Sequence, residues 1–167
     1  MSTGKQKTQA PRMALRPVIE SDLPIFFEHQ RDPIAVEMCV FTSRDWPAFV
    51  EHWTKRIMAA PTGVARTILI DGQVAGNAVT FDMFSDREIG YWIGREYWGR
   101  GLATYAVSEL LKLDPIRPIY AHVAKHNAGS LRVLQKCGFM HHGVEQGPPN
   151  ARGECVEEFV LVLNAAE

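Results

Sequence analysis

The first part of the chain contains one short apolar run followed by two stretches with helical periodicity. The apolar run at 14–18 predicts a strand, and Ser21 then offers a side-chain cap for a helix that continues through Phe26 and His29. Residues 46–57 place Trp, Phe, Val and Ile at helical spacing between polar residues, which predicts a second, amphipathic helix. Two helices are therefore expected before the main sheet.

The clearest hairpin signal is Asp71-Gly72, which separates the runs 66–70 and 73–81. An Asp-Gly pair readily adopts the positive backbone angles of a two-residue turn, so these runs are predicted to pair as antiparallel strands. A further strand is expected at 88–93, directly before a glycine-containing loop.

Helices and strands alternate in the second half of the chain. Helical periodicity covers 102–113 and ends at an Asp-Pro pair, and 119–123 is typical of a buried strand. A helix is expected at 128–136, with Asn127 as its cap and Gly138 just beyond its end. The remaining apolar patterns predict two closing strands.

The closing strands are expected at 140–145 and 156–163. The segment 146–153 between them contains Pro148-Pro149-Asn150, and such a cluster of turn residues predicts an exposed loop.

Length and composition favour one domain. A chain of 167 residues can bury a single core, so 13–167 is predicted to be one domain, preceded by a polar, disordered arm at 1–12. The 18 Lys and Arg residues nearly balance the 19 Asp and Glu residues. This balance disfavours nucleic acid or an anionic membrane as a partner held by charge.

The three cysteines are widely separated and lie outside any spacing typical of zinc ligands. Neither a metal site nor a disulfide framework is expected, and a reducing cytoplasm fits this usage. No apolar run approaches the roughly 18 residues needed to span a bilayer. Cys137, beside Gly138, is interpreted as buried packing rather than as an acyl carrier.

A short segment of small residues is the candidate for chemistry. Gly99, Gly101 and Ala103 leave the backbone uncrowded at the start of the helix 102–113, where unpaired N–H groups suit phosphate oxygens. Arg100 can add a charge-assisted contact or can simply be solvated. The segment lacks the lysine and hydroxyl of a P-loop, and it follows a hairpin rather than opening a Rossmann unit.

These residues resemble the GNAT family of acyl-CoA N-acyltransferases. That family's central motif is Gln/Arg-x-x-Gly-x-Gly/Ala after a strand, and 98–103 matches it at both small positions, with Trp98 in place of Gln or Arg. The closer likeness is to the RimJ/RimL type of ribosomal-protein N-acetyltransferase, over about 15–163. The segments that carry this likeness are Leu15-Arg16-Pro17 with Asp22, Glu88–Ile93, Tyr97–Thr104, Asn127–Ser130 and Val133–Phe139.

The resemblance implies an α/β fold, with a mixed, mostly antiparallel twisted sheet, helices on both faces and splayed central strands at 88–93 and 119–123. The gap between those strands would admit the pantetheine arm of acetyl-CoA, which can pair with exposed strand backbone. The residues expected to bind the cosubstrate are Tyr91, Trp92, Ile93, Gly99, Arg100, Gly101, Leu102, Ala103, Thr104 and Asn127.

Direct transfer to an amine needs an oxyanion donor, a proton for the departing thiolate and a proton acceptor. A strand N–H near Ile93 or Gly94 is the candidate oxyanion donor. Ser130 is the candidate proton donor, although Ser in the first turn of a helix also commonly bonds backbone. Glu88 is the candidate base, although a carboxylate at a strand end is usually solvated, and Glu37 is a weaker alternative.

The acceptor is expected to be the amine of a protein N-terminus or of a small molecule. Its pocket would lie between the early helices, 81–87 and 146–153, the segments most free to vary. Trp46 and Trp53 are interpreted as core rather than as pocket walls. A homodimer is compatible with the resemblance. The alternative to an enzyme is a CoA-binding regulatory module without catalysis, which would keep the loop at 99–104.

Overall fold

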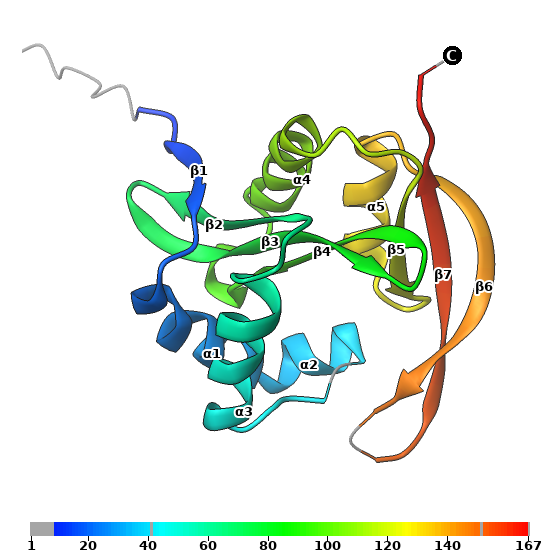
Figure 1. Cartoon of the computed structure of the whole chain (residues 1–167), viewed down its shortest axis with the longest axis horizontal. Helices are drawn as coiled ribbons and strands as arrows, with labels where there is room; N and C mark the ends of the chain where they lie inside the picture. The colour runs from blue at the N-terminus through cyan, green and yellow to red at the C-terminus, as the bar shows by residue number, and fades with distance from the viewer. Residues whose placement is uncertain (1–8, 41, 151, 167) are drawn as a thin grey trace, which may run out of the picture.

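The residues that this computed structural model describes, 9–40, 42–150 and 152–166, are built around a seven-stranded sheet of order β1-β2-β3-β4-β5-β7-β6 (Figure 1). Neighbouring strands are antiparallel except for β4 and β5, which are parallel. The strands are β1 (Met13–Pro17), β2 (Val64–Ile70), β3 (Gln73–Met83), β4 (Asp86–Ile93), β5 (Ile119–Ala124), β6 (Met140–Pro149) and β7 (Cys155–Leu163).

Helices cover both faces of the sheet, which confirms the predicted fold class. On one face lie α4 (Leu102–Leu113) and α5 (Ala128–Lys136), and on the other lie α1 (Leu23–Arg31), α2 (Pro33–Cys39) and α3 (Trp46–Glu51) (Figure 1). The larger buried core lies between the sheet and α4 and α5. A smaller cluster of Phe26, Phe49 and Trp53 lies under the early helices.

The early helices differ from the prediction in three respects. Ser21, expected to cap the first helix, lies within a 3₁₀ turn at Glu20–Asp22, and α1 begins at Leu23 without a side-chain cap. The sequence predicts two helices here, but α2 is a third, capped by the Asp32 side chain, which accepts from the backbone N–H groups of Ile34 and Ala35. Only Ala35 of this short helix is buried, so it has no apolar stripe that periodicity could detect. The second predicted helix is also divided, because α3 continues as a π-helical segment at His52–Ile57.

The interpretation of the helical tryptophans as core is correct for one of the two. Trp53 is 3% exposed and packs against Phe26. Trp46 is 41% exposed and contacts the rings of Phe27 and Phe49 from outside the core. Trp46 begins α3, where the helix reaches the surface.

The predicted hairpin is confirmed, with Ile70 paired to Gln73 and positive φ angles at both Asp71 and Gly72. The exposed loop predicted at 146–153 is partly wrong, because β6 extends through Pro149. β6 is an edge strand that pairs only with β7 among the described strands, so its prolines need not donate to a second neighbour. The turn is confined to the residues after Pro149, where Gly153 N–H donates to the Asn150 carbonyl.

The predicted arm at 1–12 lies largely outside the described residues. Of its described part, Arg12 exchanges hydrogen bonds with Asp71: Arg12 N–H donates to Asp71 Oδ1, and Asp71 N–H donates to the Arg12 carbonyl.

Asp22 anchors the N-terminal strand to the helical face. Its carboxylate accepts two hydrogen bonds from the Arg16 guanidinium, at 2.6 and 2.7 Å, one from Thr67 Oγ1 at 2.6 Å and one from Ile19 N–H at 3.1 Å. Burial alone would raise the pKa of Asp22, but these donors, Arg16 foremost, hold it below its ordinary value. Arg16 and Asp22 of the sequence motif thus have a structural role.

We expect Asp22→Asn to lower the free energy of unfolding by about 2 kcal/mol, because it weakens the Arg16 pair and leaves Thr67 without its charged acceptor. Because the folded pKa is depressed, this stabilisation is present above the unfolded pKa of Asp and is lost as the pH falls through the folded pKa. Urea titrations at several pH values measure it. Glu51→Gln, which removes an exposed carboxylate paired with Lys55, is the control and should leave the midpoint nearly unchanged.

Candidate functional site

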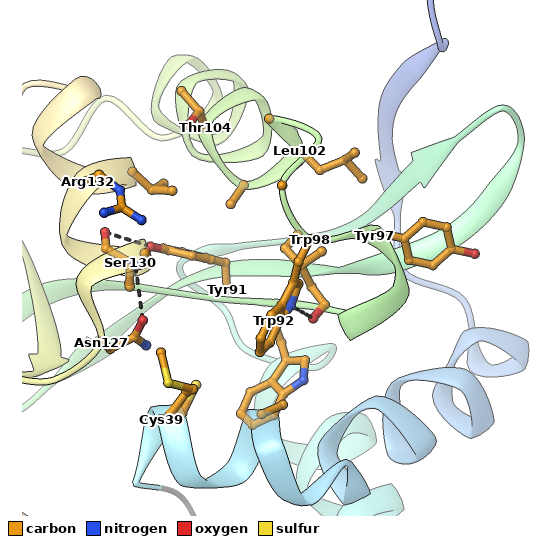
Figure 2. A pocket seen from close by; sticks show the side chains of 18 of the residues that line it. Cys39, Tyr91, Trp92, Tyr97, Trp98, Leu102, Thr104, Asn127, Ser130 and Arg132 are labelled. Atoms are coloured by element: carbon orange, nitrogen blue, oxygen red, sulfur yellow. Dashed lines mark hydrogen bonds between the residues drawn. The ribbon is translucent and has the colours of Figure 1, made fainter.

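The candidate site lies where β4 and β5 separate. Within the described strands their parallel pairing is confined to Arg87 with Ile119 and Glu88 with Tyr120, so the strands diverge beyond Glu88. This confirms the predicted splay. A pocket of about 480 Å³ lies between β4, the start of α4 and α5 (Figure 2).

Every residue predicted to bind the cosubstrate lines this pocket except Arg100. The guanidinium carbon of Arg100 lies 5.7 Å from the centre of the Tyr97 ring. Trp98, which replaces the polar residue of the family motif, also lines the pocket. The predicted residues in the lining are Tyr91, Trp92, Ile93, Gly99, Gly101, Leu102, Ala103, Thr104 and Asn127.

The start of α4 has the features of an anion site. Gly99 and Gly101 have φ angles of 74° and 78°, which L-residues with a side chain rarely adopt. Tyr105 N–H donates to the Gly101 carbonyl, and no described side chain caps the helix. The N–H groups of the first turn therefore have no partner within the helix, and the helix dipole adds positive potential at this end.

The backbone of β4 presents polar groups to the gap. Gly94 N–H donates to the Ala75 carbonyl at 2.8 Å, and Gly76 stands opposite Ile93 in the register. Because hydrogen-bonded and non-bonded pairs alternate between antiparallel strands, the backbone groups of Ile93 and Tyr91 point away from β3, toward the gap. The proposal of Gly94 as oxyanion donor is therefore wrong, since its N–H already has an acceptor within the sheet.

The Trp98 side chain forms a hydrogen bond with one of these backbone groups: its indole N–H donates to the Ile93 carbonyl at 2.9 Å. The tryptophan at the first motif position thus fixes the loop before α4 to the end of β4. The Ile93 N–H, on the same side of the strand, stays the candidate oxyanion donor.

Tyr91 and Ser130 form a hydroxyl pair at the centre of the site. Figure 2 shows Tyr91 reaching from β4 toward Ser130 on α5, and their oxygens lie 2.6 Å apart. Asn127 caps α5, with its Oδ1 accepting from Ser130 N–H at 3.1 Å. Burial is the main cause that raises the pKa of Tyr91 to about 12, so its phenol stays protonated near neutral pH.

A second pocket, of about 360 Å³, adjoins the first and shares Cys39, Tyr91, Trp92, Asn127 and Ser130 with it. It extends under the early helices. Its lining also includes Arg44, His52, Trp53, Asn77, Phe81, Glu88 and His122.

This second pocket partly matches the position predicted for the acceptor. The early helices contribute to it, and so does Phe81, the first residue of the predicted segment 81–87. None of the described residues of 146–153 lines it. Residues 146–149 belong to the edge strand β6, which β5 and β7 separate from β4, so this segment lies away from the pocket.

Glu88 lines the second pocket rather than the first, and it is only 9% exposed. The expectation of a solvated strand-end charge is therefore wrong. Glu88 Oε1 lies 3.3 Å from His122 Nε2, while His122 Nδ1 lies 3.9 Å from Glu145 Oε2 and 3.8 Å from Glu158 Oε2. Glu37 is exposed and lines neither pocket.

The carboxylates around His122 change its proton affinity. The hydrogen bond with Glu88 is the main cause that raises the pKa of His122, and it outweighs desolvation. Burial is the main cause that raises the pKa of Glu158. No group of three or more His, Cys, Asp or Glu side chains among the described residues is arranged to hold a metal ion.

Some pocket residues were missed by the sequence analysis. Gly129, Arg132, Val133 and Lys136 lie on one face of α5 and line the first pocket. Gly129, Arg132 and Lys136 are three or four residues apart in the sequence. This spacing predicts that a small residue and two cations share one face of the helix, which is a pattern suited to an anionic ligand. Cys137 packs against the main core, as interpreted, but it is half-buried rather than buried, and its Sγ lies 3.6 Å from Ser108 Oγ.

The sequence matches a family model described as Acetyltransferase (GNAT) domain over residues 12–140. A stretch of 80 residues is 30% identical to the uncharacterized N-acetyltransferase p20 of Bacillus licheniformis, and the match spans 46% of this chain and 45% of that protein. No helix among the described residues is long and apolar enough to cross a membrane.

Solved structures share the fold at low sequence identity. RimJ of Mycobacterium smegmatis in complex with CoA-disulfide is 21% identical with a TM-score of 0.73, over 92% of this chain and 82% of that chain. Spermidine N-acetyltransferase of Vibrio cholerae, in complex with CoA and spermine, is 18% identical with a TM-score of 0.73, over 90% and 95%. The yncA protein of Salmonella typhimurium with its cofactor acetyl-CoA is 16% identical with a TM-score of 0.75, over 93% and 95%.

Proposed function

The chain belongs to the GNAT acetyltransferase family, and from this premise we propose that it transfers the acetyl group of acetyl-CoA directly to the amine of a small molecule. The observation that carries the proposal is the continuous arrangement of the two pockets. The first leads from the uncapped start of α4 along β4 to Tyr91 and Ser130, and the second begins at those same residues.

The residues of the first pocket fit acetyl-CoA. The free N–H groups at the start of α4 suit its pyrophosphate, and Arg132 and Lys136 on α5 add cations along the same wall. The backbone of Tyr91 faces the gap, where an amide of the pantetheine arm can pair with it as an added strand would. At Ile93 the carbonyl already accepts from Trp98, and the N–H is the proposed oxyanion donor. Solved relatives of this fold bind CoA or acetyl-CoA, which supports the same cosubstrate here.

The groups for acetyl transfer meet where the pockets join. As the amine nitrogen bonds to the acetyl carbon, the carbonyl oxygen gains negative charge, which the Ile93 N–H stabilises. The carbon–sulfur bond then breaks, and the Tyr91–Ser130 pair supplies a proton to the departing thiolate. The proton that the nitrogen must still lose to become an amide passes through water back to this pair, which restores it. Tyr91 is suited to this because its phenol keeps its proton near neutral pH.

An ammonium must lose a proton before it can attack, and Glu88 with His122 forms the proton acceptor. Neutral His122 takes the proton, directly or through water, and the neighbouring carboxylates stabilise the resulting imidazolium. His122 must be neutral to accept, so activity falls as the pH drops through its raised pKa.

The acceptor is a small amine rather than a protein N-terminus. The likeness to RimJ favours a polypeptide, but the second pocket is walled by Trp53, Phe81 and Trp92 and has a volume suited to a metabolite. The test is an assay with acetyl-CoA and a panel of small primary amines and short peptides, which detects CoA thiol and acetylated product. Saturable cosubstrate binding without turnover on any amine would favour the regulatory module instead.

Tyr91→Phe is expected to lower kcat by about tenfold while KM for acetyl-CoA changes little. The loss stays below the usual range for general-acid catalysis because a thiolate is already a fair leaving group. Tyr97→Phe, which changes a tyrosine of the same pocket that does not reach Ser130, is the control. Equal kcat values for the parent and Tyr91→Phe would remove the phenol from the mechanism.

A further inference from the structure

Resting on the proposed function, we propose that the acyl donor is not limited to acetyl-CoA, and that the site takes a short, uncharged acyl chain such as propionyl or butyryl, with its end against α2. The first pocket does not stop at Tyr91 and Ser130, where the thioester is placed. It continues to Ala35, Met38 and Cys39 on α2. An acetyl group ends with a methyl beyond its carbonyl, so this part of the pocket is left for a longer chain.

Helix α2 lies across the end of the gap between β4 and β5. At its start, the cap residue Asp32 accepts a hydrogen bond from Arg95 Nε at 2.6 Å, and Arg95 lies two residues beyond the end of β4. Near its end, the Glu37 carbonyl accepts from His126 Nε2 at 2.9 Å, and His126 lies two residues beyond the end of β5. The helix is thus tied to the ends of both strands, and a group that passes between them from the α4 side meets it.

Figure 2 shows the order of the groups along this path. Leu102 and Thr104 on α4 lie at one end, Tyr91 and Ser130 lie between, and Cys39 on α2 lies at the other end. The phosphates of the donor are placed at the start of α4 and its sulfur beside the Tyr91–Ser130 pair. Its acyl group therefore points toward α2.

The α2 end of the pocket is apolar and uncharged. Ala35, Met38 and Cys39 share one face of the helix, because Met38 and Cys39 follow Ala35 by three and four residues. Trp92 adds aromatic surface, and its indole N–H donates to the His29 carbonyl at 3.2 Å. Desolvation raises the pKa of the Cys39 thiol to about 11, so the thiol stays neutral. Such a wall favours a hydrocarbon chain over a carboxylate, and a flexible methionine adapts to its shape.

This space is separate from the one proposed for the amine. Ala35 and Met38 line the first pocket but not the second, whereas Glu88 and His122 line the second but not the first. Cys39 is the residue of α2 that lines both pockets. The amine therefore approaches from the side of the carboxylates and leaves the α2 side to the acyl chain.

The experiment compares how tightly the full chain binds acetyl-, propionyl-, butyryl- and succinyl-CoA, by calorimetric titration. Each added methylene should tighten binding about threefold through its burial against α2, so butyryl-CoA should bind about tenfold more tightly than acetyl-CoA. Succinyl-CoA has the same chain length as butyryl-CoA but ends in a carboxylate, and it should bind at least about tenfold more weakly than butyryl-CoA. Binding that weakens with each added carbon, or equal binding of the butyryl and succinyl thioesters, would overturn the proposal.

Transfer of the longer chain follows the chemistry proposed for acetyl. The amine nitrogen bonds to the acyl carbon, the carbon–sulfur bond breaks, and one proton moves from nitrogen to sulfur, so CoA leaves as a thiol. Assays with small primary amines should therefore show propionyl and butyryl transfer with kcat/KM at least equal to that of acetyl. Tighter binding of butyryl-CoA with no amine acylated would reject the proposed function and keep the acyl site, whereas transfer of acetyl alone would reject the acyl site.

Variants assign the chain-length preference to α2. Cys39→Phe fills the end of the pocket, so it should remove the advantage of about tenfold that butyryl-CoA has over acetyl-CoA. Cys155→Phe makes the same change at an exposed cysteine that begins β7 and lines neither pocket, and it should keep the advantage. Met38→Ala enlarges the space and should shift the tightest binding from butyryl- to hexanoyl-CoA. Parent chain-length preferences in both folded α2 variants would overturn the assignment.

Discussion

Gly101→Glu is expected to abolish saturable binding of acetyl-CoA, with at least about 100-fold weaker affinity, a loss of roughly 3 kcal/mol. Gly101 is the N-cap of α4, and a Cβ built there meets no atom within 4 Å, so the new side chain projects into open space beside the helix start. Its carboxylate then competes for the N–H groups proposed to bind the pyrophosphate. Calorimetric titration of parent and variant measures the effect.

The control separates this effect from backbone strain. Gly153 has the same φ of 78° as Gly101, and its Cβ would also meet nothing within 4 Å. Gly153→Glu therefore adds the same charge and a similar strain, of about 1 to 2 kcal/mol, at a turn that lines neither pocket. A folded Gly101→Glu that binds acetyl-CoA as the parent does would reject the anion site. A parent that binds no acetyl-CoA would reject the cosubstrate assignment.

The sequence contained enough local information to predict the frame of the site. Asp71-Gly72, Asn127 and Gly138 act through neighbouring residues, so their turn and cap roles were predictable from short segments. The same holds for Gly99 and Gly101, whose left-handed conformations lie next to the helix they begin. The predicted gap, by contrast, depended on a family resemblance, because the divergence of β4 and β5 is a property of the whole sheet.

The acceptor side could not be predicted because its residues meet only through strand register and helix placement. His122 reaches Glu88 because parallel pairing places Glu88 beside Tyr120, two residues away. The same reasoning explains the error at Gly94. Its N–H donates to β3, and the Asp71-Gly72 signal, which joins β2 and β3, does not fix the register between β3 and β4.

Glu88→Gln is expected to lower kcat by about 100-fold at its pH plateau, because the amide cannot stabilise the imidazolium that forms when His122 takes the ammonium proton. The variant should also change the shape of the profile. Since the hydrogen bond with Glu88 is the main cause of the raised pKa of His122, its loss lowers that pKa. His122 then becomes neutral at lower pH, so the acid limb of kcat shifts toward lower pH while the plateau falls.

Glu145→Gln is the matched control. Glu145 also faces His122, at 3.9 Å, but its side chain is 64% exposed, and of the three neighbouring carboxylates it contributes least to the raised pKa of His122. It should leave the plateau unchanged and move the acid limb only slightly. His122→Asn should remove the limb and lower the plateau as Glu88→Gln does. A Glu88→Gln enzyme with the parent's plateau would mean that the acceptor amine loses its proton to bulk water, and that the buried Glu88 serves only to hold His122 in place.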